Sequence, residues 1–95
     1  PPPIQKIVFS EQFKGGVADL PPDRLRHINE RIDDIALFIQ RNINPNRLDF
    51  KKLKGNPCPP STHECVAWAD QNAWRIFSHF EGDTLVLDSL GTGLH

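Results

Sequence analysis

Cysteine is scarce in this sequence, which has only Cys58 and Cys65 among its 95 residues. Two cysteines are too few for the disulfide framework of small secreted domains, so we expect both thiols to be reduced. Structural zinc needs four ligands, whereas Cys58, His63 and Cys65 offer three at irregular spacing. We therefore expect no metal, and nothing in the sequence indicates a cofactor.

Long apolar runs are also absent, because no stretch approaches the roughly 18 apolar residues that a membrane-spanning helix needs. The segment from Pro1 to Phe9 lacks the basic stretch and apolar run of a secretory signal. We therefore expect a cytoplasmic protein with no membrane partner. A chain of 95 residues has room for one hydrophobic core, which predicts a single domain over residues 1–95.

Net charge is small, at −1 at pH 7, so the protein as a whole has no attractive field for nucleic acid. The basic residues are nevertheless concentrated in one segment. Between residues 41 and 54 there is one acid, Asp49, and there are five basic residues: Arg41, Arg47, Lys51, Lys52 and Lys54. This local excess predicts a contact with an anionic partner or substrate.

The first third of the chain predicts a strand and two helices. Ile4 to Phe9 is a short β-prone run, and Ser10 stands where a helix N-cap should. A short helix follows, with Phe13, Val17 and Leu20 on one face, and the prolines at 21 and 22 end it.

The second helix begins at Pro22 or Asp23 and extends to about Ile39. Its apolar stripe consists of Leu25, Ile28, Ile32, Ile35, Ala36 and Ile39. On this pattern Arg24, Arg31, Asp34 and Gln40 are expected to face away from the core. Two helices this short cannot bury both apolar stripes alone, so strands must supply a second layer.

The rest of the chain predicts a long connection and a β-meander. Asn42 to Pro60 is rich in turn residues, with Leu48, Phe50 and Leu53 docking and the lysines on a loop or strand entry. Three β-prone runs follow: Glu64 to Ala69, Trp74 to Phe80 and Thr84 to Leu90. We therefore predict an α+β fold of order β-α-α-β-β-β, an antiparallel sheet with an N-terminal helical hairpin on one face.

Two motifs give this pattern a family resemblance. They are the run K-K-L-K-G, from Lys51 to Gly55, and the aromatic-Arg-Ile of Trp74 to Ile76. With the helix from Arg24 to Ile39 and the closing L-V-L-D-S-L-G, from Leu85 to Gly91, they make the chain resemble the RelE/ParE superfamily over nearly its whole length. The resemblance implies the toxin of a type II toxin-antitoxin system, held inactive by a cognate antitoxin.

In the RelE branch, the resemblance implies metal-free cleavage of messenger RNA on the ribosome. Such cleavage needs a base, an acid and cations that stabilise the developing negative charge. The resemblance places Arg75 at the phosphate, and the candidate catalytic residues are Arg75, Lys52, Lys54, His95 and Glu64. The candidate RNA-binding residues are Arg47, Lys51, Lys52, Lys54 and His63.

The C-terminus departs from the pattern of the ribonucleases. Active relatives usually have a tyrosine or histidine in or after the last strand, whereas this chain has no tyrosine. After Gly91 it offers Thr92, Gly93, Leu94 and His95, so His95 would have to serve as the general acid.

Three hypotheses therefore stand. The first is a ribosome-dependent messenger RNA endonuclease, and the second is a ParE-like protein that inhibits DNA gyrase without hydrolysis. The third is a repurposed domain, or the toxin domain of a larger protein neutralised by an immunity protein. In each case we expect a protein partner to cover the groove between the sheet and the helical hairpin, with an acidic or apolar helix that complements Lys51, Lys52 and Lys54.

Overall fold

The computed structural model describes residues 6–68 and 73–92. Its helices are α1 (Glu11–Ala18) and α2 (Pro22–Arg41). Its strands are β1 (Lys6–Phe9), β2 (Lys51–Lys52), β3 (His63–Trp68), β4 (Trp74–Glu81) and β5 (Thr84–Thr92). The predicted order β-α-α-β-β-β is confirmed, and the lysine run adds the two-residue strand β2.

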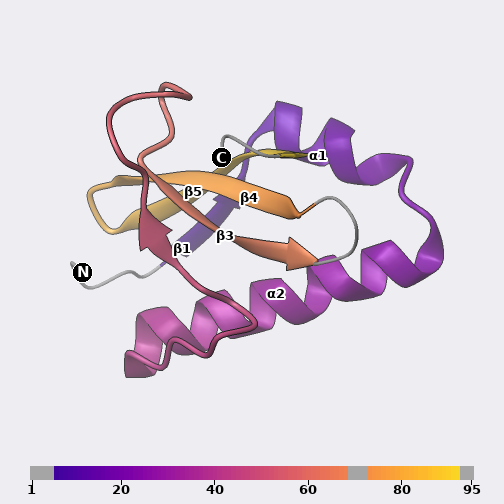
Figure 1. Ribbon diagram of the computed structural model, residues 1–95, viewed down its shortest axis with the longest axis horizontal. Helices are drawn as coiled ribbons and strands as arrows, with labels where there is room; N and C mark the ends of the chain where they lie inside the picture. Colours follow the sequence, from indigo (N-terminus) through magenta and orange to yellow (C-terminus); the bar gives the residue numbers. More distant parts are fainter. Residues whose placement is uncertain (1–5, 69–72, 93–95) are drawn as a thin grey trace.

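The strands form one mixed sheet in the order β1-β5-β4-β3-β2 (Figure 1). The pairs β2–β3, β3–β4 and β4–β5 are antiparallel, as the predicted meander requires. Strand β1 instead pairs in parallel with β5, with Ile7 opposite Leu85. Because β1 and β5 are separated by the whole chain, no local turn signal could have indicated that pairing.

Each helix begins and ends where the local chemistry requires. The hydroxyl of Ser10 accepts a hydrogen bond from the backbone N–H of Phe13, so the predicted N-cap is confirmed. Pro22 occupies the first turn of α2, where its missing N–H has no cost. Asn42 ends α2 in the left-handed conformation, with its N–H on the carbonyl of Phe38.

One core joins both helices to the sheet. Phe13 of α1 and Ile28 and Ile35 of α2 are buried in the same cluster as Ile76 of β4 and Leu87 of β5. The predicted docking of Leu48, Phe50 and Leu53 is also confirmed, because all three are buried. Neither helix in the described part of the chain has the length and apolar character of a membrane-spanning segment.

Two residues of α2 contradict the predicted outward face. Arg31 and Asp34 are buried, at 9% and 7% exposure. They form an ion pair at 2.5 Å, and Arg47 from the following connection adds a second cation to Asp34. Charged side chains can be buried when they are paired, which a hydropathy pattern does not reveal.

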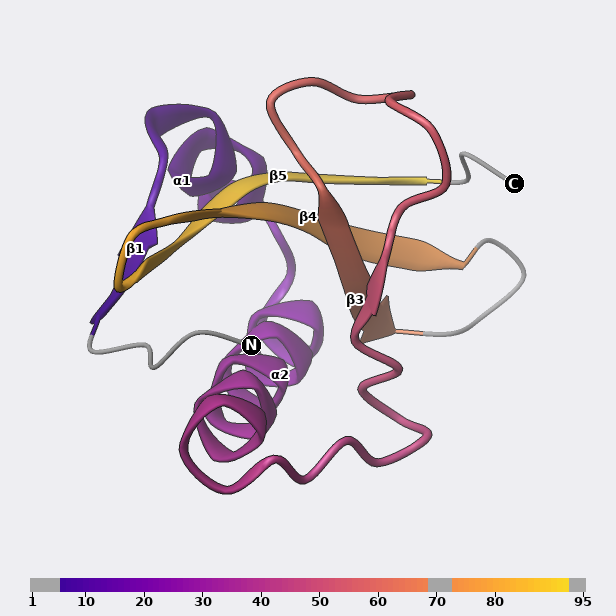
Figure 2. The same cartoon turned by 90° about the vertical axis from the view of Figure 1, so that its left-hand side faces the viewer.

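The two faces of the sheet are covered by different segments of the chain. Both views place α2 on one side of β3, β4 and β5, and the segment between β2 and β3 on the other (Figures 1 and 2). In β4, Ile76 is fully buried in the core, whereas Arg75, Phe77 and His79 alternate with the core positions. These three side chains therefore lie on the face of the sheet opposite the core.

Candidate functional site

Arg75 is the centre of a charged cluster on this second face of the sheet. Its Nε lies 3.3 Å from Oε1 of Glu64 on β3, and its Nη1 lies 3.4 Å from Oδ2 of Asp49. Lys51 of β2 approaches the same Asp49 oxygen at 3.4 Å. The pairing of Lys51 with Glu64, and of Glu64 with Phe77, puts these side chains on one face across three strands.

The cluster is graded in exposure. The side chains of Glu64 and Arg75 are 2% and 12% exposed, whereas those of Asp49 and Lys51 are 43% and 45% exposed. The Nε of Arg75 is buried and makes no hydrogen bond within the described residues, although it faces Glu64 at ion-pair distance. The buried part of the cluster is the ion pair of Glu64 and Arg75. Its exposed part consists of the carboxylate of Asp49 and the ammonium group of Lys51.

Asp49 reaches the cluster because its connection is locally ordered. The side-chain amide of Asn44 donates to the carbonyl of Phe50 and accepts from the N–H of Phe50, at 3.0 Å each. The N–H groups of Leu48 and Asp49 both donate to the carbonyl of Pro45. Asp49 itself is in the left-handed region, with φ of 47°, a conformation that aspartate tolerates better than most residues.

The cluster can bind an anion only in competition with its own acids. Arginine binds phosphate through a planar fork of N–H donors. In this structure the fork of Arg75 faces the carboxylates of Glu64 and Asp49, which neutralise its charge. A phosphate entering from solvent would meet Lys51 and Asp49 first, and would have to displace the carboxylate of Asp49 to reach Arg75.

The remaining lysines flank the cluster. Lys52 is exposed on β2 and pairs in register with His63, so it projects to the other side of the strand from Lys51. Lys54 is exposed in the segment that follows. The structure thus brings Arg75, Glu64 and Lys51 together and leaves Lys52 and Lys54 beside them.

Three other candidates lie elsewhere. Arg47 binds Asp34 through its Nε at 3.1 Å and its Nη2 at 3.0 Å, on the side of α2. His63 packs between Phe50 and Phe80, with ring centroids 5.6 Å and 4.8 Å away. His95 lies outside the described residues.

The setting of His63 favours a neutral ring. Burial is the main cause that lowers its pKa, and the nearby charge of Lys52 lowers it further. Its Nδ1 lies 2.8 Å from the hydroxyl of Thr62. A neutral imidazole against two aromatic rings contributes packing, and its role in RNA binding stays a prediction.

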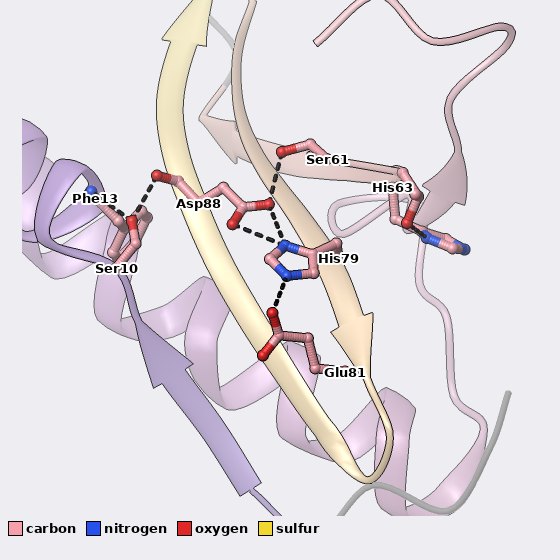
Figure 3. A network of polar contacts seen from close by, with 8 residues as sticks. Ser10, Phe13, Ser61, His63, His79, Glu81 and Asp88 are labelled. Carbon is pink, nitrogen blue, oxygen red and sulfur yellow. Dashed lines mark hydrogen bonds and ion pairs between the residues drawn. The ribbon is translucent and has the colours of Figure 1, made fainter. Parts of the chain in front are cut away.

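A second polar cluster, which the sequence did not predict, lies on the same face (Figure 3). Nδ1 of His79 lies 2.8 Å from both carboxylate oxygens of Asp88, and its Nε2 lies 2.9 Å from Glu81. Asp88 also accepts a hydrogen bond of 2.7 Å from the hydroxyl of Ser61. The register of β4 and β5 shifts between Phe77 and Ser78, which leaves Asp88 as the extra residue of a bulge.

The carboxylates around His79 favour its protonated form. Burial alone would lower its pKa, and it is the largest single cause, but the hydrogen bonds and charges of Glu81 and Asp88 together raise the pKa above its usual value. The backbone carbonyl of Asp88 also accepts a 2.6 Å hydrogen bond from Ser10, the cap of α1. The sequence held one signal for this position. His79 stands four residues after Arg75 in the same strand, so the two side chains are expected on the same face.

Comparison with solved structures identifies the architecture. A copper-bound mutant toxin from Helicobacter pylori superposes with a TM-score of 0.62 at 16% identity, covering 94% of both chains. The RelB-RelE antitoxin-toxin complex from Methanococcus jannaschii gives 0.60 at 20% identity, covering 90% of this chain and 88% of that one. The E. coli DinJ-YafQ toxin-antitoxin complex gives 0.59 at 17% identity, covering 95% and 92%.

The protein has the RelE-type fold. The resemblance deduced from the K-K-L-K-G and aromatic-Arg-Ile motifs is thereby confirmed at the level of the fold. No protein-family model and no curated protein sequence matches the chain. The RelE-type likeness is therefore carried by the arrangement of helices and strands, at identities of 20% or less for the three structures described.

Proposed function

We propose that this protein is the toxin of a type II toxin-antitoxin pair, acting in the cytoplasm and silenced by a protein antitoxin. The RelE-type fold supports this, since two of the similar structures are toxins in complex with their antitoxins. The charged face around Arg75 supports it further. It gathers side chains from β2, β3 and β4 on a surface that a partner can cover as a unit.

The reaction that we propose is ribosome-dependent cleavage of messenger RNA without a metal. The 2′-hydroxyl attacks the adjacent phosphate, which breaks the bond to the 5′-oxygen and leaves a 2′,3′-cyclic phosphate. In this scheme the exposed Lys51, Lys52 and Lys54 bind backbone phosphates, and Arg75 stabilises the pentavalent phosphate. The single observation that carries the proposal is the convergence of Lys51 and Arg75 on one carboxylate, that of Asp49, which marks a position suited to an anion.

Proton transfer in this scheme falls to Glu64 and His95. Glu64 lies 3.3 Å from Arg75, so it is placed to take the proton of the 2′-hydroxyl next to the group that binds the phosphate. His95 is the proposed acid for the leaving oxygen, and Arg47 and His63 are proposed as further RNA contacts outside the cluster.

A second candidate function is inhibition of DNA gyrase without hydrolysis. The observation that favours it is the pairing of Arg75 with both Glu64 and Asp49, which leaves its charge compensated. An arginine whose charge is already paired would order this face as a protein-binding surface and would not stabilise a reacting phosphate. The two functions differ in whether a bond of RNA is cut.

Induced expression in a bacterium tests the proposal. We expect growth arrest that a co-expressed antitoxin relieves, and messenger RNA 5′ ends that fall in phase with codons. Arg75→Lys and Lys52→Ala should abolish or strongly reduce those cuts, because one removes the guanidinium fork and the other a phosphate contact. Lys14→Ala, an exposed lysine on α1, is the control and should cut normally.

A parallel supercoiling assay with purified gyrase separates the two candidates. Inhibited supercoiling without codon-phased ends would reject the nuclease and support the gyrase inhibitor. Growth arrest with neither signature would reject both targets.

A further inference from the structure

The loop that connects β2 to β3 lies on the charged face of the sheet, on the side opposite α2 (Figure 2). Leu53 begins the loop and Thr62 ends it, and the N–H of Leu53 donates to the carbonyl of Thr62 at 2.8 Å. The N–H of Thr62 donates in turn to the carbonyl of Ser78 on β4, at 2.9 Å. These two hydrogen bonds fix the base of the loop beside β4.

Backbone hydrogen bonds can do little for the rest of the loop. Prolines occupy positions 57, 59 and 60, and they have no N–H to donate. The N–H of Ser61 donates to the carbonyl of Cys58, which closes a turn within the loop and does not attach it to the sheet. Attachment of the loop beyond its base therefore depends largely on side chains.

Ser61 supplies such a side-chain contact (Figure 3). Its hydroxyl donates a hydrogen bond of 2.7 Å to Oδ2 of Asp88 on β5. The two residues are 2% and 8% exposed, so water hardly competes for this bond. A hydrogen bond to a carboxylate is about twice as strong as one between neutral groups. Ser61 is thus a strong anchor between the loop and the sheet.

Asp88 is itself held by two further elements. His79 of β4 lies 2.8 Å from both of its carboxylate oxygens, and the second ring nitrogen of His79 lies 2.9 Å from Glu81. The hydroxyl of Ser10, before α1, donates a hydrogen bond of 2.6 Å to the backbone carbonyl of Asp88. A carboxylate can be buried at low cost when it is paired in this way. Asp88 therefore offers the loop an acceptor in a fixed position.

The loop carries one of the lysines of the proposed RNA surface. Lys54 follows Leu53 directly and is exposed. Gly55 comes next, in the left-handed region with φ of 71°, which turns the chain. The position of Lys54 relative to Arg75 therefore depends on how the loop lies. A loosely attached loop would have to be ordered by the RNA, and that entropy cost would weaken binding.

We propose that Asp88 is a positioning residue for RNA binding, which fixes the loop that carries Lys54 through its hydrogen bond with Ser61. The inference rests on the proposed function, in which Lys54 contacts a phosphate of the RNA. It gives the second polar cluster a role in that function, although Asp88 itself touches no RNA.

Amide hydrogen exchange of the full chain tests whether this contact holds the loop. We expect Ser61→Ala to speed exchange at the N–H groups of Leu53 and Thr62 by about tenfold, because a charge-assisted hydrogen bond no longer opposes local opening. Ser78→Ala is the matched control, since Ser78 is 1% exposed and its side chain lies on the other face of β4. The control should leave exchange in the loop unchanged. Equal acceleration by the two variants would overturn the inference.

Binding of hexauridylate RNA, measured by fluorescence anisotropy, tests the positioning of Lys54. At low salt, Ser61→Ala and Lys54→Ala should each weaken the affinity about two- to fivefold, the range of one exposed charge contact. The double variant should bind no more weakly than Lys54→Ala, because Ser61 acts through Lys54. Additive losses would overturn the inference, since a merely structural effect of Ser61→Ala would weaken binding in both backgrounds.

Failure of the inference and failure of the proposed function give different results. Unchanged loop exchange in Ser61→Ala, or unchanged RNA affinity despite a loosened loop, rejects the positioning role and leaves the proposed function standing. A chain that neither binds nor cuts RNA, while its loop still depends on Ser61, rejects the proposed function and with it the role of Asp88 in RNA binding.

Discussion

Asp49 and Arg75, which are 26 residues apart in the sequence, form an ion pair of 3.4 Å on the sheet face. Asp49 occupies the approach to Arg75 and also pairs with Lys51, so a single carboxylate neutralises part of both cations. A phosphate ligand would have to compete with it. In the proposed function, the charge of Asp49 would therefore limit how strongly this face attracts RNA.

Removing that negative charge should strengthen RNA binding. We expect Asp49→Asn to raise the affinity for a single-stranded RNA about two- to fivefold at low salt, the range that one partly exposed charge pair supplies. Asparagine also tolerates the left-handed backbone at this position. Fluorescence anisotropy measures the effect, with Asp33→Asn on the exposed side of α2 as the control. Unchanged affinity in Asp49→Asn would show that Asp49 does not lie at the proposed RNA-binding surface.

The buried pair of Arg75 and Glu64 should be more costly to break than to replace. We expect Arg75→Met alone to lower the free energy of unfolding by about 3–5 kcal/mol, because it takes the charge of Arg75 from a buried carboxylate. The double variant Arg75→Met with Glu64→Leu should recover most of that loss. Urea denaturation of the two single variants and the double variant measures the coupling. Additive losses would show that the two side chains do not act as a pair.

His79 should make the protein less stable as the pH rises above neutrality. Its pKa is raised in the folded state, so its stabilising contribution is complete below the unfolded value of about 6.5 and is lost as pH rises through the folded pKa. Urea titrations between pH 6.5 and 8.5 should reveal this decline, and His79→Gln should remove it. His63→Gln is the control. The pKa of His63 is lowered, so its titration should change the free energy of unfolding only below about pH 6.5.

Asp34 should contribute far more stability than its neighbour on the same helix. We expect Asp34→Asn to cost about 3–5 kcal/mol, since it leaves the buried Arg31 without its closest carboxylate. Asp33→Asn, at an exposed position, should change the free energy of unfolding by at most about 0.5 kcal/mol. The pKa of Asp34 is lowered, so its contribution should be present above about pH 4 and be lost on further acidification. Thermal unfolding of the two variants at pH 7 and pH 3 measures both effects.

The two thiols should differ sharply in reactivity. Burial raises the pKa of Cys65 to about 12, and the residue is 1% exposed, so almost no thiolate forms at pH 8. Cys58 is a free cysteine that is partly exposed. Iodoacetamide at pH 8 should therefore label one site in the native protein and two in urea, as counted by mass spectrometry. Cys58→Ser should abolish native labelling, and labelling of Cys65 at a comparable rate would contradict the assignment.

The helices and strands of this protein follow from local sequence signals. Local signals such as the Ser10 cap, the prolines at 21 and 22 and the apolar stripe through Ile28 and Ile35 act within a few residues, so they can be read without a fold. The same holds for the order β-α-α-β-β-β, for the docking of Leu48 and Phe50, and for the RelE-type likeness that the motifs indicated.

The pairing of charged side chains, in contrast, depends on the folded arrangement of distant segments. Arg31 and Asp34 face the interior because Arg47, more than ten residues away, completes their pairing, and the parallel partner of β1 lies at the other end of the chain. The bulge that turns Asp88 toward His79 likewise depends on the register of β4 and β5. Helix caps and apolar stripes involve residues close together in sequence, so the secondary structure could be predicted from the sequence. Ion pairs and strand register depend on residues distant in sequence, so the charged clusters could not.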